Sequence, residues 1–352
     1  MWPDDRLTRL LGIEHPIIQA PMAGTTTPAL VAAIANAGGM GSHGCAALSP
    51  ETLERDMTEM RAATNGAVNL NFFCHAKPEM SEAAHSDLLA ELAPDYQRAG
   101  ANPPSNMPEV ASPRAFGPAE LALLLAHPPA VASFHFGLPD PDAIAALKTA
   151  GCKILASATT VAEARWLAER GADAIIAQGW EAGGHRGVFL DVENDAQVGL
   201  FALLPQIVDA VAVPVIAAGG IADGRGIAAA FALGASGVQI GTAFIDCAEA
   251  AQRDWHIAAL QEGHDDSTMI SSAVSGRPAR AHRTPWLTRM KDVTSAPFPL
   301  MYHYTRPLQA ADPEPHHFAL YGQSAALRPA GSARDRFDQL VTDAQKALVP
   351  AG

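Results

Sequence analysis

The chain has 352 residues, of which 48% are hydrophobic and only 17% are charged. It therefore has enough apolar side chains to build a core, and its composition excludes a disordered segment. The 24 lysines and arginines against 37 aspartates and glutamates give a formal net charge of −13. Because a surface of that sign repels phosphate backbones, we expect no nucleic-acid partner. The length fits one large domain with an added segment.

The cysteines and the apolar segments bear on the compartment. Cys45, Cys74, Cys152 and Cys247 lie far apart and form no Cys-x-x-Cys pair, so neither a zinc ribbon nor a disulfide scaffold is expected. The first residues lack the basic start and apolar run of a secretion signal, and no window approaches the roughly 18 apolar residues of a membrane span. We therefore expect a cytoplasmic protein without a membrane partner.

Short apolar runs alternate with Ala-rich amphipathic stretches from Pro16 onward, a pattern typical of β-α units around a parallel sheet. In chain order, the predicted strands cover residues 17–21, 39–43, 68–73, 131–137, 153–158, 174–178, 215–219 and 237–241. Eight strands close a barrel, and the span up to residue 247 matches the roughly 250 residues of that fold. The predicted fold class is α/β, a (β/α)8 TIM barrel with a small helical cap.

Helices are predicted between these strands at residues 28–37, 50–63, 141–150, 160–170 and 225–233. Several begin with proline or with a capping hydroxyl such as Ser49 or Thr160, as helix N-termini prefer.

Three parts of the chain are expected. Residues 1–247 form the barrel, with a lid-like excursion over residues 74–130 that carries helices at 81–98 and 118–126. Residues 248–315 lose the β-α rhythm and are expected to form a helical cap that contributes to the substrate site. Residues 316–352 are expected to be a tail that returns to the barrel. A long insertion between strands, such as residues 74–130, usually lines the mouth of a barrel, where active sites lie.

Glycines concentrate after the last two predicted strands. Gly219 and Gly220 follow strand seven, and the run from Gln239 to Thr242 ends strand eight. Glycines allow backbone N–H groups to approach a phosphate closely, and these two strands are where barrels usually bind one. The sequence therefore predicts a ligand or cofactor with a phosphate.

The stretch Gln178 to Gly187, after strand six, has four glycines in ten residues and ends in His185-Arg186-Gly187. Such a loop can lie flat against a planar ligand, and an imidazole exchanges protons near neutral pH. His185 is therefore the candidate base.

Other site chemistries lack their patterns. There is no His-Glu-x-x-His, the adjacent His316 and His317 cannot both face one ion, and His75 and His135 lie on separate strand ends without nearby acidic partners in the sequence, so we expect no metal. No Gly-x-Ser-x-Gly elbow occurs. The letters Gly39 to Gly44 match Gly-x-Gly-x-x-Gly, but these glycines fall within the second predicted strand and are interpreted as a packing feature.

Four motifs in order resemble a known family. They are Ile17 to Gly24, Asn69 to His75, Ser133 to Gly137 and Gln178 to Gly187, followed by Tyr321-Gly322-Gln323 in the tail. Together they resemble the successive motifs of class I nitronate monooxygenases, formerly called 2-nitropropane dioxygenases.

The resemblance implies an FMN-dependent barrel that oxidises alkyl nitronates, such as propionate 3-nitronate, with O2 and without NAD(P)H. The products would be a carbonyl compound and nitrite, which detoxifies nitro compounds. His185 matches the active-site histidine of the family. The positions expected to contact the flavin are Pro21, Met22, Ala23, Asn69, Gln178, Gly183, Gly184, Gly219, Gly220, Gln239, Ile240, Gly241, Thr242 and Gln323.

The substrate would be a small anion. His135, Tyr302 and Tyr304, with Arg306 nearby, are expected to line its site, although the tyrosines could equally pack within the cap. Because the net charge of −13 repels an anion, local donors such as His185 and Arg186 are expected to offset the global field.

Two alternatives stay open at this point. One is a flavin-dependent NAD(P)H enoyl-acyl-carrier or quinone reductase, which shares the glycine loop and the FMN site but needs a nicotinamide surface. The other is a non-redox barrel that binds a phosphosugar or nucleotide. The chain is expected to be a monomer or a homodimer.

Overall fold

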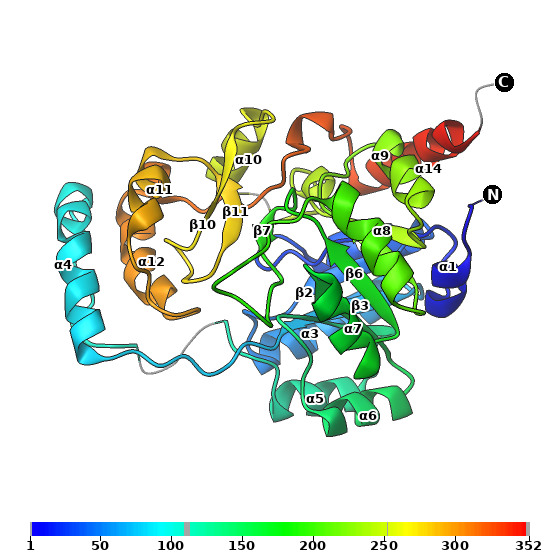
Figure 1. Ribbon diagram of the computed structural model, residues 1–352, viewed down its shortest axis with the longest axis horizontal. Helices are drawn as coiled ribbons and strands as arrows, with labels where there is room; N and C mark the ends of the chain where they lie inside the picture. Colours follow the sequence, from blue (N-terminus) through cyan, green and yellow to red (C-terminus); the bar gives the residue numbers. More distant parts are fainter. Residues whose placement is uncertain (1, 109–112, 252, 350–352) are drawn as a thin grey trace.

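The computed structural model describes residues 2–108, 113–251 and 253–349. Four residues of the expected excursion, 109–112, and the last three residues of the expected tail lie outside the described residues. The barrel occupies one side of the molecule and the cap the other (Figure 1).

Eight parallel strands form the barrel in the order β1-β9-β8-β6-β5-β4-β3-β2. A parallel bridge between Ile18 and Met40 joins the two ends of this order and closes the barrel. The strands are β1 (Ile17–Gln19), β2 (Gly41–Gly44), β3 (Val68–Phe73), β4 (Val131–His135), β5 (Lys153–Ala158), β6 (Ala174–Gln178), β8 (Val215–Ala218) and β9 (Gly237–Ile240). The predicted TIM barrel is therefore confirmed.

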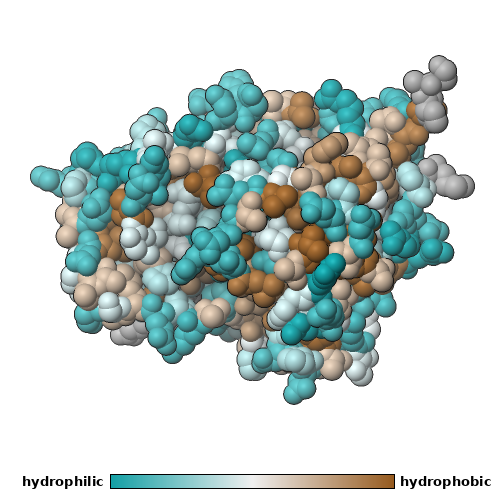
Figure 2. All heavy atoms as spheres, in the orientation of Figure 1, coloured by the Kyte–Doolittle hydropathy of each residue, from teal (hydrophilic) through white to brown (hydrophobic). Residues whose placement is uncertain are grey.

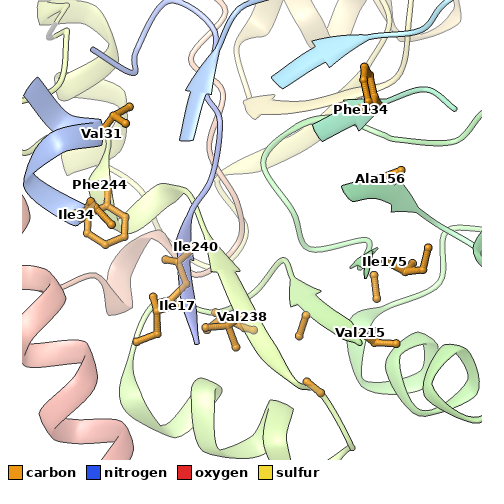
Figure 3. Packing of buried hydrophobic residues seen from close by; sticks show 14 of the residues in the cluster. Ile17, Val31, Ile34, Phe134, Ala156, Ile175, Val215, Val238, Ile240 and Phe244 are labelled. Atoms are coloured by element: carbon orange, nitrogen blue, oxygen red, sulfur yellow. The ribbon is translucent and has the colours of Figure 1, made fainter. Parts of the chain in front are cut away.

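The barrel strands carry apolar side chains on both faces, so both faces of each strand are buried. On β6, Ile175 packs in the layer between strands and helices, whereas Ile176 packs inside the barrel. Val215 and Ile216 on β8 divide in the same way. This alternation is the period of two of a β-strand, and the outward members gather beneath the helices in Figure 3.

The helices of the outer layer are α2 (Pro28–Asn36), α3 (Pro50–Ala63), α5 (Pro118–Ala126), α6 (Pro141–Thr149), α7 (Val161–Glu169), α8 (Leu200–Ala210) and α9 (Gly224–Ala232). The Ser49 and Thr160 side chains accept hydrogen bonds from the first turns of α3 and α7, which confirms both as caps. Helix α8, which holds Pro205 inside its span, was not among the helices expected from the sequence.

A helix near each end of the chain packs against the barrel. Helix α1 (Arg6–Leu11) places Leu7 and Leu11 in the interior cluster with Ile18 and Met40, so it plugs the barrel. In the tail, α14 (Ala333–Leu348) begins at the Ser332 capping box and packs against α9 and α2.

The cap has its own hydrophobic core. It contains α10 (Asp254–Gln261), α11 (Pro285–Arg289), α12 (Met301–Ala311) and α13 (Pro313–His316), and it includes α4 (Glu82–Ala99) from the excursion. Leu88 and Leu92 of α4 pack with Leu287 and Met301. Figure 1 shows α4 beside α12, and Figure 2 shows hydrophilic side chains over its outer side.

The cap also contains strands, where the sequence led us to expect helices and loops. β10 (Thr268–Ser271) pairs antiparallel with β11 (Ala279–His282), and β11 pairs with β7 (Gly184–His185). Strand β7 belongs to the glycine loop that follows β6. The cap sheet therefore holds the His185 end of this loop above the barrel.

Candidate active site at the carboxyl ends of the barrel strands

The inner face of the barrel becomes polar toward the carboxyl ends of its strands. Asn69 Nδ2 on β3 donates to Ser42 Oγ on β2 at 3.0 Å, and Asn71 Nδ2 donates to Ser133 Oγ on β4 at 2.9 Å. Asn69 is fully buried, and its Oδ1 has no hydrogen-bond partner within the described part of the chain. Such an acceptor calls for a donor from a ligand.

The glycine-rich segments after β6 and β9 meet the tail at one place. A Cβ on Gly183 would lie 2.5 Å from Gly322 N, so only glycine allows these two backbones to approach. Gly322 N donates to Thr242 Oγ1 at 2.9 Å, and Gln323 N donates to the Glu181 carbonyl at 3.1 Å. The predicted positions Gly183, Thr242 and Gln323 are thus brought together.

Gly219 and Gly220 follow β8 with φ angles of 108° and 70°, in the left-handed region that favours glycine. A Cβ on Gly219 would lie 3.0 Å from Ala182, so this turn packs directly against the loop after β6. Gly184 also has a positive φ, and the space where its Cβ would lie is open among the described atoms.

The segment from Pro21 to Ala23 lies between β2 and β9. A Cβ on Gly44 would lie 2.6 Å from Ala23 N, and one on Gly241 would lie 3.6 Å from Met22 Sδ. In the described structure, Gln239 Oε1 is buried without a hydrogen-bond partner. The Ile240 side chain instead packs in the layer beneath the outer helices (Figure 3), so only its backbone faces this end.

Gln178 holds the backbone on both sides of Arg186. Its Nε2 donates to the His185 carbonyl at 2.9 Å, and its Oε1 accepts from Gly187 N at 2.7 Å. Both ends of the Gln178 amide are therefore occupied by its own loop. Its expected contact with a flavin would have to be made in addition to this clamp.

Arg186 is fully buried and paired. Its Nε donates to Asp195 Oδ2 at 2.9 Å, and its Nη1 donates to the Gly179 carbonyl at 2.9 Å. Our expectation that Arg186 helps to attract an anionic substrate is wrong, because Asp195 already neutralises it. Arg186 instead fixes the beginning of the glycine loop.

A second arginine fixes the same loop from the cap. Arg280 on β11 donates from Nη2 to the Trp180 carbonyl at 2.8 Å and from Nη1 to Thr268 Oγ1 at 2.9 Å. Both Arg280 and Arg186 lie within 5.5 Å of the centre of the Trp180 ring, a distance at which a cation and an aromatic face attract each other.

The His185 ring sits among phenylalanines. The ring centres of Phe298, Phe136, Phe73 and Phe318 lie 5.3, 6.1, 6.2 and 6.2 Å from it; we call these four residues the aromatic wall. Phe136 has a φ of 71°, an unusual conformation for a non-glycine residue. His185 Nε2 is buried here without a hydrogen-bond partner among the described residues.

Burial is the largest cause of the pKa shifts of the histidines in this region. Burial, followed by the charges of neighbouring histidines and of Arg277, lowers the pKa of His185 to about 3. Burial also lowers the pKa values of His135 and His75 to about 4. His185 is therefore a neutral imidazole near pH 7 and a weak base.

The three predicted substrate residues lie in two places. His135 Nε2 donates to the His185 carbonyl at 3.1 Å, and Tyr302 lies 6.4 Å from Phe298 of the aromatic wall. The Tyr304 hydroxyl instead bonds His85 Nδ1 on α4 at 2.7 Å, within the cap core. His135 and Tyr302 thus lie near His185, whereas Tyr304 joins α12 to α4.

An open groove of about 700 Å³ lies on the cap between α4 and residues 292–297. Glu79, Asp87, Glu91 and Asp292 are part of its lining, so it repels anions. We therefore place the candidate active site at the strand ends, where unpaired polar atoms gather, and not in this groove. Over the described ranges, no group of three or more potential ligands is placed to hold a metal ion, and no helix is long and apolar enough to span a membrane.

Several residues of this region escaped the sequence analysis. Arg277 lies with its Cζ 3.9 Å from the centre of the Phe136 ring, and Phe298 and Phe318 complete the aromatic wall. They come from the cap and the tail, where no strand pattern pointed to a site. The run Ser275-Gly276-Arg277-Pro278 was the available signal, since it sets an arginine in a Gly/Pro turn.

Comparison with known proteins agrees with this arrangement. The sequence profile of the nitronate monooxygenase family matches residues 4–343. A nitronate monooxygenase from Paraburkholderia phytofirmans is 42% identical over 349 residues, which cover 97% of this chain and 95% of that protein. The chain belongs to the nitronate monooxygenase family. The resemblance noted in the sequence is thereby confirmed, as is the expectation of an enzyme.

Solved structures resemble this nitronate monooxygenase family member over nearly its whole length. The nitroalkane oxidase of Streptomyces ansochromogenes superimposes with a TM-score of 0.87 and 34% identity, covering 97% of this chain and 98% of that one. FabK from Thermotoga maritima superimposes with a TM-score of 0.72 and 29% identity, covering 97% and 96%. The first is the more similar in both measures.

Proposed function

We propose that this chain binds FMN and oxidises alkyl nitronates of the propionate 3-nitronate type with O2, giving a carbonyl compound and nitrite. The observation that carries the proposal is a set of buried polar atoms at the strand ends. Within the described residues, Asn69 Oδ1, Gln239 Oε1 and His185 Nε2 have no partner in the protein. A planar ligand with donors and acceptors on its edges would supply what they lack.

The residues at this site suit a flavin with one phosphate. Asn69 and Gln239 would bond the edge of the ring system, and the segment from Pro21 to Ala23 would lie along it. The turn at Gly219 and Gly220 and the Thr242 hydroxyl would hold the phosphate. Thr242 Oγ1 accepts from Gly322 N, so its own hydrogen can be donated to a phosphate oxygen.

When bound, the flavin supplies the electron-transfer chemistry that amino-acid side chains lack. The protein's own task is to hold an anion beside it and exclude water. The aromatic wall surrounds His185 with apolar rings, and a dry setting strengthens each hydrogen bond made there. His185 would orient the nitronate by donating from Nε2 to one of its oxygens.

The low pKa of His185, about 3, favours a substrate that arrives already deprotonated. A base this weak removes a carbon-bound proton poorly, because efficient proton transfer needs a base with a pKa near the working pH. We therefore propose that nitronates are used far better than neutral nitroalkanes. The scattered cysteines support a cytoplasmic location, and the assembly is proposed to be a monomer or a homodimer.

The direct test is oxygen uptake by purified, flavin-loaded protein over a panel of nitronates, each paired with its neutral nitroalkane. The flavin is released and identified by chromatography, where FMN is expected and FAD would contradict the proposal. Nitrite formed with each nitronate should accompany the oxygen uptake. Equal rates with the neutral partners would contradict the role given to His185.

His185→Asn tests that role in the same assay. The variant should keep its flavin and lose at least about tenfold in kcat/KM, because a hydrogen bond to a charged group is removed from a buried site. His264→Asn, on an exposed histidine, is the matched control and should change little. Unchanged kcat/KM in His185→Asn would remove His185 from the mechanism.

A further inference from the structure

Arg277 brings a cation from the cap to the group of histidines at the strand ends. It follows β10 in the turn that leads to β11, and its Cζ lies 3.9 Å from the centre of the Phe136 ring. One of its Nη atoms donates to the Val188 carbonyl. Its Nε is buried and has no hydrogen-bond partner within the described ranges.

The charge of Arg277 is not matched by an acid in contact. Among the described residues it takes part in no ion pair, and Glu163 is the acid that acts on its pKa. Glu163 is occupied elsewhere: its Oε2 accepts from Thr159 N and Oγ1, both at 2.7 Å, and its Oε1 accepts from Phe189 N at 2.6 Å. Burial lowers the pKa of Arg277 to about 10.

The two buried arginines nearby do not share this feature. Arg186 has Asp195, and Arg280 donates from Nε, Nη1 and Nη2 to Trp180 and Thr268. A cation that is partly removed from water and has no anionic partner is unfavourable, so the partly buried Arg277, with its buried and unpartnered Nε, points to an anionic ligand that completes it. The histidines cannot serve, because their lowered pKa values keep them neutral or, if protonated, repelled by Arg277.

Arg277 lies within reach of a substrate held by His185. Both lie beside the Phe136 ring: the guanidinium lies over it, and the imidazole is nearly perpendicular to it, with the ring centres 6.1 Å apart. The guanidinium and the imidazole centre are therefore separated by at most about 10 Å, since both distances share the Phe136 centre. A three-carbon chain with an acceptor at each end spans such a gap once hydrogen-bond lengths are added.

We propose that Arg277 binds a carboxylate on the end of the substrate remote from the nitronate, and so selects carboxyalkyl nitronates over alkyl nitronates. This inference rests on the function proposed above. The planar guanidinium matches a carboxylate with two parallel N–H donors, whereas the neutral imidazole of His185 offers one donor to a nitronate oxygen. Arg277 is thus a specificity-determining residue, and the substrate is a dianion.

The test uses two nitronates that differ only at this end. Propionate 3-nitronate carries a carboxylate where propyl-1-nitronate carries a methyl group, so the ratio of their kcat/KM values measures the contribution of the carboxylate. In Arg277→Met that ratio should fall about 30-fold, the loss expected for a charge-assisted hydrogen bond. Arg277→Lys keeps the positive charge but lacks the two parallel N–H donors of a guanidinium, so it should retain part of the preference for the carboxylate.

Arg170→Met is the matched control, because Arg170 also lies over an aromatic ring, 4.2 Å from the centre of Trp166, but on the surface. Its ratio should equal that of the unchanged protein. Equal losses on both nitronates in Arg277→Met would overturn the proposal and assign Arg277 to the nitronate or to the fold. Thermal unfolding of each variant identifies a general loss of stability.

A binding measurement separates this inference from the proposed function. Propionate, which cannot react, is titrated calorimetrically into flavin-loaded protein, with propionamide as the neutral analogue. We expect propionate to bind, propionamide not to bind, and Arg277→Met to lose propionate binding. If no nitronate is oxidised but this pattern holds, the proposed function fails and the carboxylate site stands. Propionate binding that Arg277→Met leaves unchanged would overturn the site.

Discussion

Removing Asp195 should destabilise the protein, because it leaves Arg186 as an unpaired buried charge. The Arg186 side chain is 0% exposed and that of Asp195 is 9% exposed. Breaking a buried pair by removing one partner costs about 3 to 5 kcal/mol. The Gly179 carbonyl still accepts from Arg186 Nη1, so we expect the lower end, about 3 kcal/mol for Asp195→Ala.

This loss is measurable by two routes. In urea unfolding, the midpoint should fall without a change in slope, giving the free energy of unfolding directly. In thermal unfolding, an entropy of about 2 cal/mol/K per residue over this length turns the loss into a melting temperature lower by about 4 °C. Asp191→Ala is the matched control, since Asp191 is an exposed acid nearby that bonds only Asn194 in the described structure.

The double variant Arg186→Met, Asp195→Leu sharpens the result. Replacing both charges by apolar side chains removes the unpaired cation, so it should cost less than the two single changes together by about 2 kcal/mol or more. If Asp195→Ala behaves like Asp191→Ala, or if the single costs simply add, the reasoning about this buried pair is refuted.

Two further predictions concern the histidines and the glycine loop. Between pH 8 and pH 5 the loss of the contributions of His135 and His185 should lower the free energy of unfolding by about 4 kcal/mol. The dependence on pH should be weaker in His135→Asn and in His185→Asn, and a flat profile in the unchanged protein would contradict the low pKa values of the two histidines. The sign follows because both pKa values lie well below the usual 6.5, so the unfolded chain takes up these protons as the pH falls through 6.5 while the folded chain does not. Gly183→Ala should lose flavin on dialysis, because its Cβ would meet Gly322 N at 2.5 Å. Gly100→Ala, at the end of α4 in the cap, places its Cβ in open space at a cost of about 1 kcal/mol of backbone strain and should keep the flavin. Equal flavin retention would refute the close-packing argument.

The barrel could be predicted from the sequence because its signal is local. Each strand is a short run of apolar residues bounded by glycine or by a capped helix, and the count of eight fixes the closure. The site position followed from the same fact, since a strand has a known carboxyl end. His185 and the glycines of its loop were singled out as candidates in this way.

The features that could not be predicted from the sequence depend on contacts between segments that are far apart in the chain. Strand β7 is two residues long and exists because β11 pairs with it, almost one hundred positions later. Arg277 and Phe298 reach the site only through that cap sheet and the packing of α12. The pairing of Arg186 with Asp195 is of the same kind, because nothing in their spacing shows which way either side chain turns.

The two tyrosines show where local reasoning could have gone further. Tyr302 and Tyr304 are two positions apart on α12, so their side chains point in nearly opposite directions around the helix. They could not both line one site. The structure turns Tyr302 toward Phe298 and Tyr304 toward α4, and the helical period predicts this division once the helix is known.

The most direct test of the account is anaerobic stopped-flow mixing of the flavin-loaded protein with propionate 3-nitronate and, separately, with NADPH. We expect the nitronate to change the flavin spectrum within the turnover time and NADPH to leave it unchanged. Rapid bleaching by NADPH, with no response to the nitronate, would contradict the proposed oxidation of nitronates and favour a nicotinamide-dependent reductase.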